Sequence, residues 1–472
     1  MEEITCDICV IGAGSGGLSV AAGAAQMGAD TVLIEGAEMG GDCLNHGCVP
    51  SKSLLAVAKQ AHLMRNPPVP GVAAADPQID YAAAKDHVAR VIETIAPVDS
   101  QERFEGLGVR VLRGWASFED EKTVVTDAHR VRARRFVIAT GSSPFVPPID
   151  GIGDVPYLTN ETLFALRDRP EHLLIIGGGP IGLEMAQAHA RLGSRVTVIE
   201  ADRALPRDDR EQVEIVLAQL ASEGVQVLEG QKVTRVRHSD GVIRIETEGG
   251  TYEGSHLLVA AGRRINLDRL DLDRAGIAHD RGVTVGTDLR SPSNRRVYAI
   301  GDAAGGAQFT HVAGYHAGIV VRSAVLGMTW SKARTDHIPH VTYTDPELAH
   351  VGMTEAETRE KFGGRTKVLR FNYAENDRAI ATGRTTGFVK LVVANGRPCG
   401  ASIIGSDAGD LIAIWSEAIA NGTKLSAIAN TVLPYPTLSE INKRAAGAYF
   451  APQLFENASV KSVVRLVQKY LP

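Results

Sequence analysis

The chain contains little cysteine, no long hydrophobic run and no large excess of either charge. Its five cysteines among 472 residues are too few and too scattered for a disulfide scaffold. No run of about 18 consecutive apolar residues occurs, so we expect neither a membrane span nor a membrane partner. No charged segment followed by an apolar stretch opens the chain, so no secretory signal is expected. Together these absences predict a soluble, cytoplasmic protein in a reducing compartment.

The charge balance excludes a further class of protein. Lys and Arg number 50 and Asp and Glu number 55, which gives a formal net charge of −5. This near balance argues against a nucleic-acid partner, because nucleic-acid binders carry a basic excess or stripe. The hydrophobic fraction of 44% is enough for large cores, and the length predicts about three domains. Glycine is abundant, at 49 residues, and the motifs below account for the surplus.

A nucleotide-binding pattern lies near the start of the chain. The apolar run Cys6–Ile11 is followed by a glycine-rich turn, a helical pattern and a second apolar run that ends at Glu35. The turn reads Gly-x-Gly-x-x-Gly, with its glycines at Gly12, Gly14 and Gly17. Such glycines let the backbone approach a pyrophosphate on the helix N-terminus, and the acid binds ribose hydroxyls. A glycine-rich turn between ordinary elements is the alternative, but both strands and the acid favour dinucleotide binding.

The same unit returns in the middle of the chain. A predicted strand, His172–Ile176, leads through a second glycine turn into a helix and a strand that ends at Glu200. The glycines of this turn are Gly177, Gly179 and Gly182. Two dinucleotide sites in one chain predict a flavin and a nicotinamide cofactor. A carboxylate at Glu200 repels a 2′-phosphate, so we expect NAD(H) rather than NADP(H), although Arg203 nearby could soften that preference.

Three further strands are predicted to end near these ligands. The runs Phe136–Gly141 and Leu257–Gly262 resemble each other, which is consistent with a repeated domain. A third run ends at Asp302, whose side chain can reach a ligand at the carboxyl end of the strand or cap a helix instead. From Pro339 onward, strands and then helices predict an α+β domain. The whole pattern predicts an α/β fold.

A cysteine pair comes after the first unit. Cys43 and Cys48 stand on either side of four residues, and Pro50 predicts a helix start close to Cys48. A helix N-terminus favours the thiolate, so the pair reads as a redox dithiol. A zinc site is the main alternative, but no second Cys or His pair completes it, and we expect no resident metal. Two buried structural cysteines are the other alternative.

These motifs together resemble the flavin-dependent pyridine nucleotide–disulfide oxidoreductases, which include dihydrolipoamide dehydrogenase, glutathione reductase and mercuric reductase. The resemblance rests on Cys-x4-Cys-Val-Pro-Ser-Lys, both glycine turns, the Ala-Thr-Gly and Ile-Gly-Asp strand ends and the stretch Tyr343–Gly352. It implies two Rossmann-like dinucleotide-binding domains and a C-terminal α+β dimerisation domain. The implied domains are 1–145 with 288–338 for FAD, 146–287 for NAD(P), and 339–472 for the homodimer interface.

The resemblance also implies a role for individual residues. Cys48 matches the thiolate beside the flavin and Cys43 the thiol that attacks the substrate. Lys52 matches a lysine near the flavin ring, and Glu184 its carboxylate partner. Asp302 matches the acid that binds the ribityl chain, and Glu35 the acid that binds the FAD ribose. Further cofactor contacts are implied at Ala116, Thr140, Gly141, Thr310, Val233 and Gly262.

One stretch departs from the family pattern. Disulfide reductases of this family carry a catalytic His near the C-terminus, offered to the partner subunit, where this chain has Tyr435; Glu440 is kept. A Tyr of ordinary pKa, about 10, is a poor base at neutral pH, and Glu440 should raise that pKa. Mercuric reductases also have a Tyr there, but they end in a Cys pair, whereas the last cysteine here is Cys399. His46, between the redox cysteines, reads as a tolerated loop residue or as a substitute base.

The sequence therefore predicts a flavoprotein that transfers electrons between NAD(P)H, FAD and a redox-active Cys pair. The expected substrate is a disulfide or dithiol, as for dihydrolipoamide dehydrogenase, at a composite site of the homodimer. A mercuric-reductase-like metal reductase and a low-turnover flavin-binding sensor are the alternatives. The expected catalytic residues are Cys43, Cys48, Lys52, Glu184, Tyr435 and Glu440.

Overall fold

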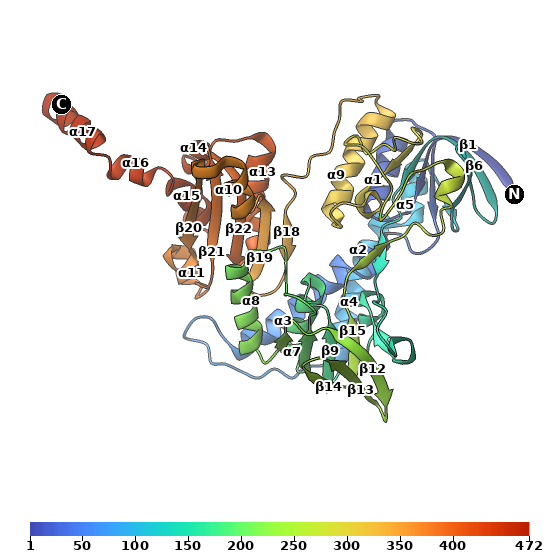
Figure 1. The fold of residues 1–472 in the computed structure, drawn as a ribbon, viewed down its shortest axis with the longest axis horizontal. Coiled ribbons are helices and arrows are strands. Elements are labelled where there is room, and N and C mark those ends of the chain that lie inside the picture. Colours follow the sequence, from blue (N-terminus) through green and yellow to red (C-terminus); the bar gives the residue numbers. More distant parts are fainter. Residues whose placement is uncertain (472) are drawn as a thin grey trace. The chain divides into compact units, whose positions relative to one another are not determined.

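The computed structural model describes residues 1–471, which form two compact units (Figure 1). Unit 1 comprises Met1–Ala58, Gln78–Asp202 and Leu228–Arg334. Unit 2 comprises Lys59–Pro77, Arg203–Val227 and the chain from Thr335 onward. Both glycine turns lie in unit 1, and the predicted C-terminal domain lies in unit 2. The division into three domains stays a prediction.

The larger sheet of unit 1 carries the first glycine turn. Its order is β3–β2–β1–β6–β5–β4, and β17 pairs with β6 on a separate branch. The strands are β1 (Glu2–Ile11), β2 (Thr31–Glu35), β3 (Val109–Arg113), β4 (Ser117–Asp120), β5 (Thr123–Val125), β6 (His129–Ile138) and β17 (Val297–Ala299). Strands β3, β2, β1, β6 and β17 run parallel. Parallel strands are covered on both faces, and accordingly the middle residues of β2 and the last residues of β1 and β6 are apolar and buried.

The helices of this part lie in the connections between the strands or after β17, and α3 continues into unit 2 from Lys59. They are α1 (Ser15–Gln26), α2 (Gly41–Asn45), α3 (Cys48–Arg65), α4 (Tyr81–Ile95), α5 (Gln101–Gly106) and α9 (Thr310–Val320). Helix α1 packs against α9, and the side chain of Leu18 is buried beside them. Helices α1 and α9 come after strand ends, and α3 comes after the dithiol loop. In sheets of this class, ligands bind at the carboxyl ends of the strands.

A second parallel sheet carries the other glycine turn. Its order is β11–β10–β9–β15–β8, and helix α7 (Pro180–Arg191) comes after β9. The strands are β8 (Tyr157–Leu158), β9 (His172–Ile176), β10 (Arg195–Ile199), β11 (Gln226–Leu228) and β15 (His256–Val259). Smaller sheets complete the unit: β7 (Ser142–Pro144) with β16 (Arg263–Ile265), and β12 (Val233–Ser239) with β13 (Val242–Thr247) and β14 (Gly250–Gly254). Helix α6 is Asn160–Leu163.

Unit 2 is built on an antiparallel sheet of order β18–β19–β22–β21–β20. Its strands are β18 (His340–Thr342), β19 (Glu347–Gly352), β20 (Thr366–Asn372), β21 (Phe388–Ala394) and β22 (Arg397–Gly405). Its helices are α8 (Arg210–Ser222), α10 (Glu355–Phe362), α11 (Asp377–Ala381), α12 (Ala408–Leu411), α13 (Ala413–Asn421), α14 (Leu425–Ala429), α15 (Glu440–Gly447), α16 (Ala451–Phe455) and α17 (Ala458–Tyr470). Trp415 and Tyr373 are fully buried in its core. The predicted α/β fold with a C-terminal α+β domain is confirmed.

Candidate active site

The two glycine turns have the same backbone hydrogen bonds. The amide of Gly12 donates to Ile34 O at 2.9 Å, and the amide of Gly177 donates to Ile199 O at 2.9 Å. Both glycines have positive φ, +106° and +115°, a conformation that disfavours a side chain. A Cβ on Gly17 or Gly182 would lie 1.9 or 2.0 Å from the carbonyl oxygen of the turn's first glycine. The third glycine of each turn is therefore required for helix α1 or α7 to approach its strand.

The acids at the strand ends lie against these turns in the same way. Glu35 accepts hydrogen bonds from the amides of Ala13 at 2.5 Å and Ala37 at 2.6 Å. Glu200 accepts from the amides of Gly178 at 2.6 Å and Asp202 at 2.9 Å. Each carboxylate thus lies beside the first half of its turn, where the ribose of a dinucleotide binds in such motifs.

The middle glycines leave room for a ligand. A Cβ on Gly14 or Gly179 would meet no atom within 4 Å, and neither residue has positive φ. Both are helix N-caps without a side-chain hydrogen bond. Free space beside amides at a helix N-terminus suits a pyrophosphate, so both turns fit a dinucleotide.

Other predicted FAD contacts lie at the end of β6. Thr140 Oγ1 is buried and has no hydrogen-bond partner among residues 1–471, which fits a group that a bound ligand would satisfy. Gly141 comes next, with φ of +65° and open space at its Cβ position. Ala116 is buried, and the neighbouring Trp115 is half exposed beside Gly36. Sequence reasoning missed Trp115, although it is one of three tryptophans and comes directly before Ala116.

The redox cysteines lie at two short elements joined by a tight loop. Cys43 is in α2, and Cys48 is the first residue of α3, so Pro50 lies in the first turn of that helix. The sulfur of Cys48 lies 3.3 Å from Oγ1 of Thr310, the first residue of α9. Two helix N-termini therefore meet at Cys48. Both cysteines are free thiols in this structure.

The surroundings of the two thiols favour a different protonation state for each. The hydrogen bond from Cys43 lowers the pKa of Cys48 to about 6, helped by the Thr310 hydroxyl and the charge of Lys52. The same hydrogen bond and burial raise the pKa of Cys43. Cys48 is thus the thiolate near neutral pH and Cys43 the protonated thiol, as in a dithiol with one activated member.

Lys52 and Glu184 form a close ion pair within unit 1. Lys52 Nζ lies 2.8 Å from Glu184 Oε2, and the Glu184 side chain is almost fully buried on α7. A buried carboxylate is stabilised by such a partner, and Lys52 in turn is held one helical turn from Cys48. The pair therefore links the dithiol helix to the helix of the second glycine turn.

A second polar chain, missed by sequence reasoning, links Asp302 to the dithiol loop. Ser142 donates from Oγ to Asp302, and Arg263 donates from Nε to Ser142 Oγ at 2.7 Å. Arg263 also pairs with Asp42 at 3.1 Å, and Asn160 donates to Asp42 at 3.0 Å. Burial raises the pKa of Asp302, whereas Ser142 and Arg263 oppose the shift. No sequence signal joined these positions, because they lie on separate segments.

The predicted nicotinamide contacts lie near the second turn. Gly262 comes after β15, whose neighbour β9 ends at that turn, and it has φ of +132° with open space at its Cβ position. Val233 begins β12 and is half-buried. The backbone amide of Gln231, two residues earlier, donates a hydrogen bond to the backbone carbonyl of Glu200 at 2.8 Å, so this segment lies beside the acid.

Tyr435 has a hydrogen-bond partner that the sequence did not indicate. Its phenol donates to Asp377 Oδ2 at 2.7 Å, within unit 2. Asp377 raises the pKa of Tyr435 most strongly, and Glu440 adds to the shift in the expected direction. Asn376 donates to Thr437 O at 3.1 Å, which ties the start of α11 to the Tyr435 loop. The tyrosine is exposed and protonated at neutral pH, so it cannot act there as a base.

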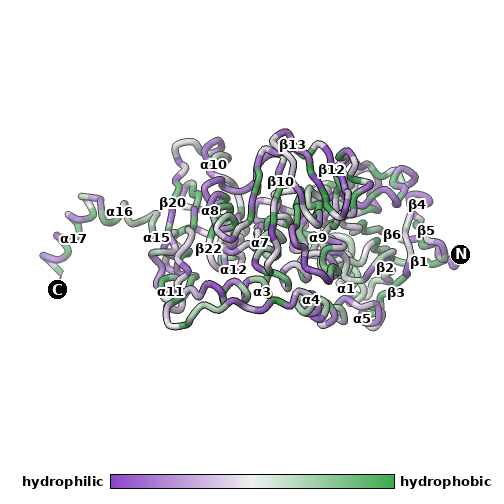
Figure 2. The backbone as a smooth tube through the Cα atoms, turned by 90° about the horizontal axis from the view of Figure 1, so that it is seen from below, coloured by the Kyte–Doolittle hydropathy of each residue, from purple (hydrophilic) through white to green (hydrophobic). Residues whose placement is uncertain are grey.

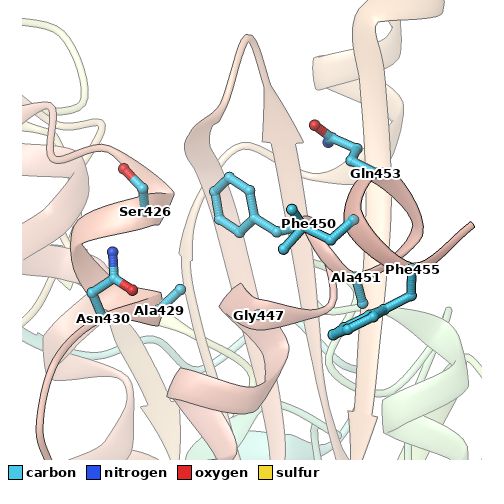
Figure 3. Close-up of a pocket in the computed structure, with 9 residues that line it drawn as sticks. Ser426, Ala429, Asn430, Gly447, Phe450, Ala451, Gln453 and Phe455 are labelled. Carbon is cyan, nitrogen blue, oxygen red and sulfur yellow. The ribbon is translucent and has the colours of Figure 1, made fainter. Parts of the chain in front are cut away.

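A shallow groove in unit 2 is separate from all of these residues. It has a volume of about 410 Å³ and lies between α14 and the α15–α16 segment (Figure 3). None of the predicted catalytic or cofactor residues lines it. His46, the suggested substitute base, lies 3.5 Å from Glu38. Among residues 1–471, no cluster of His, Cys, Asp or Glu could hold a metal ion, and no helix is long and apolar enough to cross a membrane.

Two dinucleotide turns, a redox dithiol and an antiparallel C-terminal domain define one class of protein, and the chain belongs to the pyridine nucleotide–disulphide oxidoreductase family. Residues 6–317 match the family model of that description, and residues 338–446 match the family's dimerisation domain. Members of this family are enzymes that bind FAD and a pyridine nucleotide. The family, the fold and the enzyme class predicted from the sequence are therefore confirmed.

Individual relatives and solved structures are similar to this chain over most of its length. The chain is 34% identical to a mercuric reductase of Lysinibacillus sphaericus, over 94% of this chain and 83% of that protein. A mercuric reductase of Streptomyces lividans is 35% identical, over 94% and 96%. The HOCl-induced flavoprotein disulfide reductase RclA of Escherichia coli superposes with a TM-score of 0.83, at 29% identity over 93% and 99%. LpdA of Mycobacterium tuberculosis superposes with a TM-score of 0.85, at 25% identity over 95% and 99%.

Proposed function

We propose that this enzyme uses NADH to reduce a thiophilic metal ion, with Hg(II) as the model substrate. The observation that carries the proposal is the hydrogen bond from Tyr435 to Asp377 at the position where disulfide reductases carry a His. The pair offers a phenol oxygen backed by a carboxylate, which attracts a cation and accepts no proton at neutral pH. The net reaction would convert NADH and Hg(II) into NAD⁺, Hg(0) and one proton.

Each part of the chain has a task in this proposal. Bound FAD supplies two-electron transfer between the nicotinamide and the dithiol. Glu35 and Glu200 bind ribose hydroxyls, and Glu200 favours NAD(H) over NADP(H) by repelling a 2′-phosphate. Cys48 provides a thiolate stabilised by Thr310, and Lys52, held by Glu184, keeps a positive charge close to it. Cys43 is the thiol that first meets the substrate.

The site is proposed to be composite. Tyr435 and Glu440 lie in the segment matched by the dimerisation domain, and they would face the dithiol of the partner subunit in a homodimer. Relatives support a metal substrate: several are named mercuric reductases, and RclA has been solved as a Cu(II) complex. The last cysteine in the sequence is Cys399, and the proposal assigns the capture of the metal ion to Cys43.

Disulfide reduction is the second candidate. The protonated Cys43 and the thiolate Cys48 are suited to it, and RclA is named a disulfide reductase. Disulfide reduction requires a proton for each thiol that is released. Tyr435 is a poor general acid–base at neutral pH and so would supply that proton slowly. A dihydrolipoamide-type activity would therefore be slow in this enzyme.

Steady-state NADH oxidation with Hg(II), lipoamide and glutathione disulfide tests the two candidates side by side. We expect kcat/KM to be highest for Hg(II). Tyr435→Phe should lower it about tenfold or more, because a contact to a charged group is lost. Tyr435→His should instead raise lipoamide turnover, by up to about 10²-fold if the imidazole is well oriented. High wild-type turnover of lipoamide that Tyr435→His reduces would contradict the metal-ion proposal.

A further inference from the structure

The C-terminal helix α17 carries an apolar face that its own unit does not cover. Val463, Val464 and Val467 are 58%, 51% and 39% exposed, and none of the residues of α17 is buried. With Val460 they show the three- and four-residue spacing of one helical face. In Figure 1, α16 and α17 extend beyond α15, away from the sheet of unit 2.

The charged residues on the opposite face of α17 are all basic. Lys461, Arg465 and Lys469 recur every fourth residue, so they form one stripe along the helix. No acidic residue occurs between Asn457 and the end of the chain. Figure 2 shows hydrophobic and hydrophilic residues interleaved along α17, as expected of a helix with two distinct faces. Asn457 caps the helix by accepting from the amides of Ser459 and Val460, so the helix has a defined start.

Apolar side chains continue into the preceding segment. Leu454 and Phe455 of α16 are 52% and 71% exposed, and both line the groove shown in Figure 3. The dimerisation domain shared with the family ends at residue 446, so α16 and α17 lie beyond it. The interface domain of the family therefore does not account for this exposed apolar surface.

We propose that α17 docks on the surface of an anionic lipid bilayer. An apolar face opposite a purely cationic face is the pattern of helices that lie in the membrane interface. Charge complementarity selects this occupant, since anionic headgroups attract all three cations. A second copy of α17 would cover the valines but would leave the cationic stripe without an anionic partner, because that stripe lies on the opposite face.

Vesicle sedimentation of the full-length holoenzyme tests the proposal. Vesicles of phosphatidylcholine with phosphatidylglycerol should sediment the enzyme at low salt, and vesicles of phosphatidylcholine alone should do so much less. Replacing Lys461 and Lys469 by Gln should weaken binding about 5-fold per charge, while replacing both by Arg should preserve it. Gln, Lys and Arg have similar helix propensities, so the helix itself should persist.

A second pair of variants tests the apolar face. Val463→Ser with Val467→Ser should weaken vesicle binding at every salt concentration, whereas Gln468→Ser on the polar side should leave it unchanged. NADH oxidation without vesicles should be the same in all variants, because α17 contains no residue of the proposed active site. Failure of the wild-type enzyme to sediment with anionic vesicles would overturn the proposal. So would a change of oligomeric state in the Val463→Ser, Val467→Ser variant together with unchanged vesicle binding, because a second copy would then be the occupant.

Discussion

The two glycine turns of unit 1 share their backbone geometry but lead into different segments. Beyond the first acid, the amide of Gly40 donates to Ala13 O at 3.0 Å, and a Cβ on Gly41 would lie 2.8 Å from Gly14 Cα. The dithiol loop is thus closed directly onto the first turn. Beyond the second acid, the chain leaves unit 1 at Asp202. Both turns therefore have the geometry of a nucleotide-binding turn, and the cysteine pair follows the first of them.

The middle glycines offer the sharpest test of which turn holds which cofactor. A Cβ at Gly14 or Gly179 meets no protein atom within 4 Å, and neither position has positive φ, so we expect a Val there to occupy ligand space without disturbing the fold. Gly14→Val should yield a colourless protein without FAD. Gly179→Val should keep FAD but lose reduction by NADH by about 10²-fold or more. Absorbance spectra and stopped-flow reduction measure both effects.

Gly153→Val is the matched control, because Gly153 also has open space at its Cβ position and no positive φ. It should keep both the colour and the reduction rate. If Gly179→Val lost FAD while Gly14→Val retained it, the assignment of the two turns would be reversed.

The two acids should differ in which cofactor they affect. Glu200→Ala should narrow the ratio of kcat/KM between NADH and NADPH, since lost ribose hydrogen bonds and lost repulsion act together. The combined change should be about 1–3 kcal/mol. Glu35→Ala removes an equivalent pair of backbone hydrogen bonds and serves as the control. It should weaken FAD binding and leave the NADH-to-NADPH ratio unaltered; an unchanged ratio in Glu200→Ala would count against its ribose role.

The dithiol follows the first turn, and replacing Cys43 should have the smallest effect of the substitutions considered, a shift in the pKa of Cys48. The hydrogen bond from Cys43 is the largest cause of the lowered pKa of Cys48, about 6. Ser at position 43 can still donate, whereas Ala cannot, so the Cys48 pKa should be about one unit higher in Cys43→Ala than in Cys43→Ser. At a pH between these two pKa values, a smaller fraction of Cys48 is thiolate in Cys43→Ala than in Cys43→Ser. The long-wavelength absorbance of a thiolate beside bound FAD, measured against pH, reports this difference.

A Cys48→Ser variant should show no such titration. Equal pKa values in Cys43→Ala and Cys43→Ser would mean that Thr310 and Lys52, rather than Cys43, stabilise the thiolate.

The sequence was most informative where local rules decide the structure. Both glycine turns, the strands β1, β9 and β10, and the helix starting beside Cys48 are predictable from short patterns of glycine, apolar residues and proline. Strand β22 is not predictable from local pattern, because Pro398 and two glycines interrupt its apolar residues, and its pairing with β19 and β21 depends on distant segments. The elements around the glycine turns were thus predictable, whereas β22 and the antiparallel pairing in unit 2 were not.

The candidate site divides in the same way. Cys43, Cys48 and the turn glycines belong to contiguous motifs and could be named directly. The partner of Tyr435 could not, because Asp377 lies 58 residues away and no motif connects them. Sequence proximity pointed only to Glu440, which raises the pKa of Tyr435 as expected. Long-range side-chain partners depend on the packed fold, and Asp377 further raises the pKa of a tyrosine that is protonated at neutral pH in any case.

Arg263 affects which amino-acid substitutions the enzyme tolerates near the dithiol loop. Its guanidinium is largely buried and serves Asp42 in the dithiol loop as well as Ser142, which donates to Asp302. Asp42 by itself raises the pKa of Cys48 through its negative charge. Loss of Arg263 alone would leave that charge unbalanced beside the thiolate, whereas loss of both residues would not. We therefore expect positions 42 and 263 to vary together among relatives, as a pair selected jointly rather than as two independent sites.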